Sequence, residues 1–446
     1  MNWPFASAVS SSVKNSGRPS GLVGVCLVAG CLFAGPWARA AGTPPASQPR
    51  DYHFDGTISR EVLENCLSRS ISMGGLLKGL GGEEAIRSIR AADSQRQAAA
   101  QNYLSGFQGT IAQTRSNLAT LAKSAGRAAN EFVAGGGFWV AGRQADFIAE
   151  ACGRAGGLMA AAPLGERVPA NQDVILYAVP GSLSPEDLNI IGQWQEKGAT
   201  VIKFTSPAGL YRDYFPIDTV ANLVELWTWT GEFVAACTRL GKMPVLYQSY
   251  GLPGGPERGK KYQGKRFHDD LSVKPIPAGV LGRAYLDQIE RMLAKVGGAQ
   301  MPKTLEAAKW WGRATSATVL VTGHIFPRHA QDPRTLPLGA LVAVPAWEDK
   351  DLLDASHPPQ FVLYVGYQFA PQRLVDQAKA MEVKLVYFDV QPAQPPEPAR
   401  NILYIDPAWP LADGCVTVPG YDVPILPASG VVQAAIYWTL ASERGK

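Results

Sequence analysis

Continuous apolar runs, each separated from the next by an amphipathic helix pattern, constrain this chain more than any other feature. Residues 173–179 and 200–205 are two such runs, and a helix pattern lies between them at 185–197. A strand that is apolar along its whole length is covered on both faces, which is typical of a parallel sheet between two layers of helices. The sequence therefore predicts a three-layer α/β/α fold with a parallel sheet.

The second half of the chain repeats this order. Strand-like runs occur at 317–322, 360–365 and 384–388, with a helix pattern at 371–381 and a longer Leu-, Ala- and Trp-rich helix before them, at about 281–313. Self-similarity of this kind indicates the duplication of a supersecondary unit. We therefore expect two tandem α/β/α units of flavodoxin- or Rossmann-type topology, at residues 93–275 and 276–446.

Helical segments are predicted ahead of and inside the first unit. Residues 41–92 contain a Pro/Ser-rich linker and an amphipathic leader helix that we expect to pack on the main body. A further helix pattern covers 104–132 and stops at a run of glycines. A short strand at 138–141 and a helix of small residues over 145–159 follow it.

The first forty residues have the pattern of a secretory signal peptide. Lys14 and Arg18 precede an apolar run at 21–35, and small residues around a cleavage site follow at 38–40. The run is too short to span a membrane, which takes roughly 20 helical residues. We expect a periplasmic or secreted protein without a membrane span in the mature chain. Lipoprotein processing at Cys31 is the alternative, although the apolar run continues past this residue.

Export would place the remaining cysteines in an oxidising compartment. These are Cys66, Cys152, Cys237 and Cys415, and they allow three pairings between which the sequence does not choose. Separate buried thiols are the other interpretation.

The charge balance argues against a nucleic-acid partner. The formal net charge is +4 over 446 residues, and no long Lys/Arg block occurs. No glycine motif for a nicotinamide cofactor or a nucleoside triphosphate occurs, so no cofactor is expected. His324 and His329 lack the i, i+4 spacing of a helical metal site, so no metal is expected either.

A resemblance to a known family covers residues 100–210. The stretches Gly-Gly-Phe-Trp-Val-Ala-Gly (136–142), Phe-Ile-Ala-Glu-Ala (147–151) and Arg-Ala-Gly-Gly-Leu-Met (154–159) resemble the SIS (sugar isomerase) family, to which residues 280–440 are similar only loosely. The resemblance implies a five-stranded parallel sheet, paired units, and a phosphosugar bound by Ser/Thr-rich loops at the carboxyl ends of the strands. Because one chain supplies two units, both a monomer and a homodimer are compatible with it.

The loops that follow the strands hold the candidate binding residues. Hydroxyls, backbone N–H groups and a helix N-terminus form an anion site at this edge of a sheet. The loop after the first strand lacks the serine of the family, and Arg143 is the residue available there to bind a phosphate or a carboxylate. The candidate substrate-binding residues are Gly142, Arg143, Gln144, Arg154, Ser182, Ser184, Gly323, Tyr367 and Gln368.

Aldose–ketose isomerisation needs a base that moves a proton between adjacent carbons, and a second group that helps to open the ring. The resemblance makes Glu150 the candidate base, and His324, directly after a strand-ending glycine, the second group. A helix glutamate and a loop histidine bonded to backbone are their non-catalytic interpretations. Two functions stay open: an exported isomerase of a sugar or phosphosugar, and a non-catalytic carbohydrate-binding or scaffolding protein with a degenerate SIS site.

A basic segment at 254–268 is a further candidate. Its cations are Arg258, Lys260, Lys261, Lys265 and Arg266. The two interpretations are an anion-binding lid and a solvated loop.

Overall fold

The computed structural model describes residues 82–205, 211–212, 215–321, 340–343, 351–367, 370–390 and 399–444, so the predicted signal peptide and leader helix lie outside the described residues. The helices are α3 (Gly82–Ser116), α4 (Leu118–Ala134), α5 (Ala145–Ala151), α6 (Pro185–Glu196), α7 (Asp218–Arg239), α8 (Gly255–Lys261), α9 (Val280–Gly297), α10 (Met301–Arg313), α12 (Gln372–Ala380) and α13 (Ser429–Arg444). The strands are β1 (Phe138–Gly142), β2 (Ala162–Pro163), β3 (Val174–Val179), β4 (Thr200–Thr205), β5 (Tyr211–Arg212), β6 (Phe215–Pro216), β7 (Ala317–Val321), β8 (Ala340–Ala343), β9 (Phe361–Val365), β10 (Lys384–Phe388), β11 (Ile402–Tyr404), β12 (Gly414–Val416) and β13 (Ile425–Pro427).

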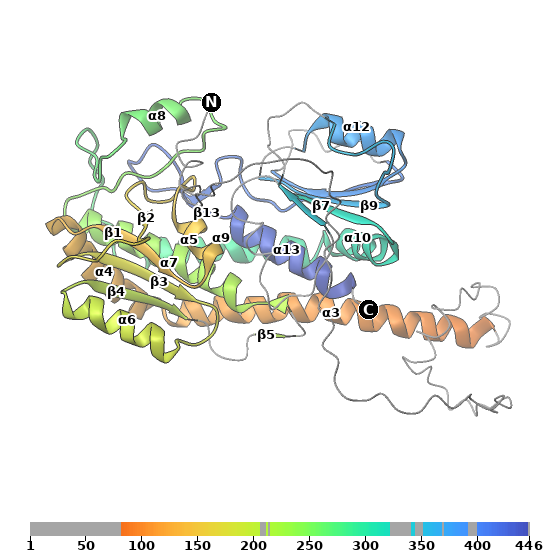
Figure 1. The fold of residues 1–446 in the computed structure, drawn as a ribbon, viewed down its shortest axis with the longest axis horizontal. Helices are drawn as coiled ribbons and strands as arrows, with labels where there is room; N and C mark the ends of the chain where they lie inside the picture. The colour runs from red at the N-terminus through yellow and green to blue at the C-terminus, as the bar shows by residue number, and fades with distance from the viewer. Residues whose placement is uncertain are drawn as a thin grey trace, which may run out of the picture. The chain divides into compact units, whose positions relative to one another are not determined.

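Two parallel sheets organise these elements (Figure 1). The first has the strand order β2-β1-β3-β4, the second has the order β11-β10-β9-β7-β8, and all neighbouring strands in both are parallel. Counted from the first strand of each sheet, both follow the order 2-1-3-4, with a fifth strand in the second, which is the flavodoxin-type order. The prediction of an α/β fold with two parallel sheets is confirmed.

Each sheet is covered on both faces because alternate side chains point to opposite sides. In β3, Val174, Leu176 and Ala178 pack into a large helical core, and the residues between them pack with α6. In β9, Phe361 and Leu363 enter the same large core, while Val362 packs on the side of α12. Uninterrupted apolar strands are therefore required, as the sequence pattern indicated.

The large core is shared by the two sheets. Its centre contains α7 and α13, whose side chains are buried almost all round, as expected for helices without a polar face. Figure 1 shows α13 between the two sheets, and its residue Glu443 accepts a hydrogen bond from the backbone N–H of Ala100 in α3, at 3.1 Å. The last described helix is thus joined to the first. No helix among the described residues is long and apolar enough to cross a membrane.

The helix predicted over 145–159 is wrong in its second half, because α5 has only seven residues. The chain then turns through Gly153 and Gly156, whose φ angles are +83° and +81°. A Cβ on Gly156 would lie 2.9 Å from the backbone nitrogen of Leu426. Close packing of this turn against the β12–β13 hairpin therefore ends the helix.

Two long predicted helices are each divided in the structure. The pattern over 281–313 forms α9 and α10, which are separated at Gly298, where the backbone leaves the helical region with φ −103° and ψ −96°. The pattern over 104–132 falls on α3 and α4, which meet at Asn117.

Candidate functional site

Each sheet has a topological switch point, between β1 and β3 in the first and between β7 and β9 in the second. Open α/β sheets bind ligands at such points, outside the carboxyl ends of the strands. The predicted binding loops follow these four strands. Of the predicted residues in the second sheet, Gly323, His324 and Gln368 lie outside the described residues, and Tyr367 is described.

At the first switch point, Arg143 binds a carboxylate of the chain itself. Its Nε and Nη2 donate to Oδ1 and Oδ2 of Asp187, at 3.1 and 2.8 Å. The hydroxyl of Tyr177 donates to Oδ1 at 2.6 Å, and the backbone N–H and hydroxyl of Ser184 donate to Oδ2 at 2.7 and 2.9 Å. One carboxylate therefore receives five hydrogen bonds, from the residue after β1, from β3 and from the loop between β3 and α6.

The local sequence explains this arrangement. Ser184 is the N-cap of α6 and Asp187 is the third residue of the helix, so the two form a reciprocal capping box. The hydrogen bonds from Arg143 hold the pKa of the Asp187 carboxyl far below its usual range, and the carboxylate raises the pKa of Arg143 in return. The Arg143 side chain is half exposed, but its charge is already paired.

The other predicted residues of this edge have different environments. Gly142 has φ +115°, and a Cβ there would lie 2.0 Å from the carbonyl oxygen of Ala178, so only glycine fits between β1 and β3. Gln144 is buried; its Nε2 donates to the Thr219 carbonyl at 3.0 Å, and its Oε1 accepts from Asn222 at 2.6 Å. Ser182 is exposed on the loop.

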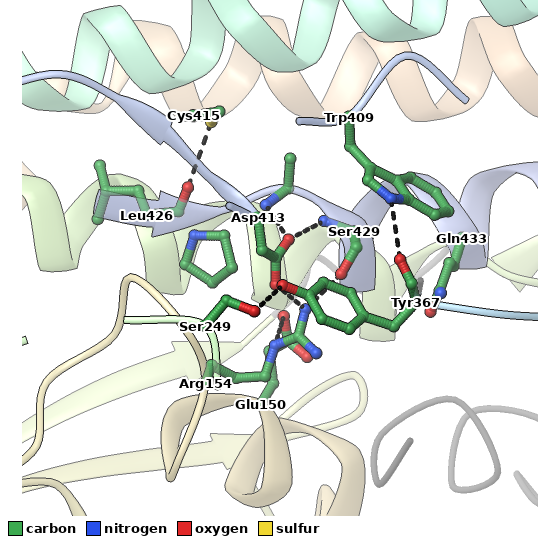
Figure 2. A network of polar contacts seen from close by, with 12 residues as sticks. Glu150, Arg154, Ser249, Tyr367, Trp409, Asp413, Cys415, Leu426, Ser429 and Gln433 are labelled. Atoms are coloured by element: carbon green, nitrogen blue, oxygen red, sulfur yellow. Dashed lines mark hydrogen bonds and ion pairs between the residues drawn. The ribbon is translucent and has the colours of Figure 1, made fainter. Parts of the chain in front are cut away.

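Three predicted residues, Glu150, Arg154 and Tyr367, meet in one polar cluster that joins the two halves of the chain (Figure 2). Nη2 of Arg154 donates to Oδ2 of Asp413 at 2.6 Å and also to the hydroxyl of Ser429. The other oxygen of Asp413 accepts from the backbone N–H of Ser429, at the start of α13, at 2.9 Å. We call these five residues the junction cluster.

Within the junction cluster, Glu150 is completely enclosed. Its carboxylate is 0% exposed, accepts from Nε1 of Trp227 at 3.0 Å, and lies 3.7 Å from Nε of Arg154. A Cβ on Gly430 would lie 2.3 Å from Oε1. Burial acts to lower the pKa of Arg154, but Asp413 and Glu150 outweigh it and raise that pKa. Glu150 therefore faces a permanent cation rather than a ligand.

Tyr367 lies on the outer side of the junction cluster. The centre of its ring is 5.6 Å from the guanidinium carbon of Arg154, and its hydroxyl donates to Ser249 at 3.0 Å. Burial raises the pKa of Tyr367 well above its usual value. Ser249 is 3% exposed, and the next residue along the chain, Tyr250, is 45% exposed.

Asp389, which was not predicted from the sequence, directly follows β10 at the carboxyl edge of the second sheet. It is 2% exposed, and its Oδ2 accepts from the backbone N–H of Ala370 at 2.5 Å. Burial raises the pKa of Asp389 to about 7, and Asp406 adds to this effect. Its position directly after a strand could have identified Asp389 from the sequence, as the same kind of position identified His324.

Asp187 and Asp413 were missed for different reasons. Ser184-Pro-Glu-Asp187 is a capping-box pattern that can be read from sequence, but it says nothing of Arg143. Asp413 meets Arg154 across 259 residues, and no local pattern records such a contact.

Most cations of the basic segment are paired with acids elsewhere in the chain. Arg258 pairs with Asp422, and Lys261 and Lys265 pair with Asp270 and Asp269 at 2.6 and 2.9 Å. Arg266 donates to backbone carbonyls at the end of α4, those of Phe132, Gly135 and Gly136. Most cations proposed for an anion-binding lid are thus engaged within the chain.

The described cysteines are free thiols. Burial raises the pKa of Cys152 and of Cys237 to about 12 and that of Cys415 further, so all three are unreactive. Cys66 lies outside the described residues. Across the described ranges, no three His, Cys, Asp or Glu side chains gather closely enough to hold a metal ion.

No protein-family model matches this sequence, and no curated protein matches it significantly. Among solved structures, the C-terminal domain of glucosamine-fructose-6-phosphate aminotransferase from Francisella tularensis is similar at a TM-score of 0.41 and 11% identity, over 76% of this chain and 96% of that one. Tagatose-6-phosphate ketose/aldose isomerase from Escherichia coli has a TM-score of 0.40 and 11% identity, over 77% and 91% of the two chains. These values describe a remote likeness.

Proposed function

We propose that this protein is a non-catalytic carbohydrate-binding or scaffolding protein with a degenerate SIS-type site. The environment of Glu150 is the observation that carries the proposal. A base for aldose–ketose isomerisation must reach a proton on the substrate carbon. A carboxylate that is 0% exposed, and is held by Arg154 and Trp227, does not have this access.

We infer a sugar ligand from the resemblance of residues 100–210 to SIS proteins. The part of the junction cluster around Tyr367 offers polar groups that suit such a ligand. The hydroxyl of Tyr367 donates to that of Ser249, which is 3% exposed, and the next residue along the chain, Tyr250, is 45% exposed. Sugars bind through hydroxyl hydrogen bonds and by stacking on aromatic faces, so we place the ligand at this edge.

A thermal-shift series tests the proposal on the chain from Ala41 onward. Each ligand is titrated over a 50-fold range of concentration, and its turnover is followed by NMR. The ligands are glucose, glucosamine, N-acetylglucosamine, gluconate and the hexose 6-phosphates. We expect at least one uncharged sugar to raise the melting temperature without turnover, and Tyr250→Ala to lose the rise. If none of these sugars raises the melting temperature, sugar binding is contradicted. Turnover that Glu150→Gln abolishes contradicts the non-catalytic interpretation.

An isomerase is the second candidate, and Asp389 favours it. A carboxyl whose pKa is raised to about 7 is suited to give and take protons near neutral pH. Because Asp389 is 2% exposed, this candidate requires that substrate binding expose its carboxyl. Turnover that is lost in Asp389→Asn but kept in Glu150→Gln would support this candidate and would move the chemistry to the second sheet.

Export through the signal peptide at residues 1–40 is part of the proposal. A fusion of residues 1–50 to alkaline phosphatase tests it, because this reporter is active only after export. We expect activity in the periplasmic fraction, and equal activity from a Cys31→Ser fusion because lipid attachment is not required. Activity confined to the cytoplasm, or membrane retention that depends on Cys31, contradicts release as a soluble protein.

A further inference from the structure

The two switch points contain equivalent loops. Residues 180–184 follow β3 and residues 366–370 follow β9, and in each case a proline comes next, at the start of α6 or α12. Ser184 and Ala370 are therefore each the fifth residue after the strand and precede a proline, although Ser184 is the N-cap of α6 whereas Pro371 is the N-cap of α12.

The backbone N–H at this position binds a carboxylate oxygen in both units. Ser184 donates to Asp187 at 2.7 Å, and Ala370 donates to Asp389 at 2.5 Å. The two acids come from different places, because Asp187 belongs to the helix that follows the loop and Asp389 ends the next strand. In both units, the amide five residues after the strand is thus paired with a carboxylate.

In the first unit the donors around this position would also suit a phosphate. A guanidinium that binds two oxygens at once, a phenol hydroxyl, a serine hydroxyl and a backbone N–H all point at the Asp187 carboxylate. Bidentate arginine and helix-terminal amides are common partners of phosphate and carboxylate groups. Asp187 is 2% exposed, so it fills this position.

We propose that Asp187 is a specificity-determining residue that occupies the anion position of the first unit, so that this position rejects phosphate and carboxylate groups. A competing anion would have to displace a carboxylate from Arg143, Tyr177 and Ser184 and would be repelled by its charge. This inference goes beyond the proposed function, which places its ligand at Tyr367 and Ser249 in a different part of the molecule. The anion position can be tested without any sugar.

Binding of inorganic phosphate to Asp187→Ser is the test. Melting temperatures are measured in phosphate and in chloride of equal ionic strength, for the wild type, Asp187→Ser, the double variant with Arg143→Gln, and Glu186→Ser. The last is a matched control, because Glu186 is an exposed acid in the same first turn, and its loss removes a charge without opening the position. We expect saturable stabilisation by phosphate in Asp187→Ser alone, with at least tenfold tighter binding than in the wild type.

Each other outcome counts against the proposal. Equal phosphate binding by the wild type means that Asp187 does not block the position. A gain in Glu186→Ser means that net charge alone is responsible, and a gain that survives in the double variant means that Arg143 is not the partner. If Asp187→Ser is unfolded in chloride, phosphate must restore its circular dichroism spectrum, and failure to do so overturns the proposal. None of these results depends on whether a sugar binds.

Discussion

His268 is a buried side chain with a polar partner at each ring nitrogen. Its Nδ1 lies 3.2 Å from Asp270 and its Nε2 lies 3.1 Å from the hydroxyl of Tyr421. That hydroxyl already accepts from Arg258 at 2.9 Å and from the backbone N–H of Leu246 at 3.2 Å. These two hydrogen bonds use both lone pairs of the phenol oxygen, so the hydroxyl of Tyr421 donates its proton to Nε2. The imidazole ring is therefore neutral, with its proton on Nδ1.

Acid should therefore weaken the fold through His268. Burial lowers the pKa of His268 below its ordinary value of 6.5, against an opposing contribution from Asp270. The unfolded chain then binds this proton at a higher pH than the folded chain, so the free energy of unfolding decreases as the pH falls through 6.5 toward the folded pKa. Urea unfolding of the wild type and of His268→Asn between pH 8 and 5.5 measures the effect. A stability difference between the two that does not change over this range would contradict it.

At the scale of elements, the two glycines of the turn after α5 differ in what a substitution would cost. One substitution strains only the backbone, and the other also produces a steric clash. Gly153 and Gly156 both have positive φ, but a Cβ on Gly153 meets nothing within 4 Å, whereas one on Gly156 meets the backbone of the β12–β13 hairpin. We expect Gly153→Ala to cost roughly 1 kcal/mol for the backbone conformation. Gly156→Ala should cost about 1–3 kcal/mol more, because the hairpin must move. Chemical unfolding of both variants checks this, and equal losses would mean that the hairpin yields freely.

The core strands were predictable because each is apolar along its length and is bounded by loop residues. The runs at 138–141, 200–205 and 384–388 match β1, β4 and β10 within one residue at either end. Element ends that depend on distant packing were not predictable. The end of α5 is set by Gly156 against Leu426, a contact across 270 residues, and no local pattern carries that information.

The candidate site was predictable in the same partial way. Strand-ending loops and the resemblance identified Arg143, Glu150, Arg154 and Tyr367, and the structure joins the last three through Arg154. The acids that neutralise the cations, Asp187 and Asp413, could not be assigned from sequence because pairing depends on the assembled sheets. Because of these two acids, cations that look free to bind a ligand in the sequence are already paired in the structure.

For the whole molecule, the shared helical core predicts one cooperative unfolding transition. Both sheets pack against the same core, and α13 contacts α3, α7 and α10. Neither sheet can lose its cover without exposing apolar surface of the other. Native-state hydrogen exchange, read by mass spectrometry, should therefore give the amides of β3 and β9 the same free energy of opening. Separate opening of one sheet at lower denaturant would mean that the halves are independent domains.

The central place of α13 also affects how the protein is made. Translation reaches this helix only after all strands of both sheets have been synthesised, and until then the surfaces of α3, α7 and α10 that it covers have no partner. A nascent chain on the ribosome therefore cannot complete its core, and chaperones have a long interval in which to bind it.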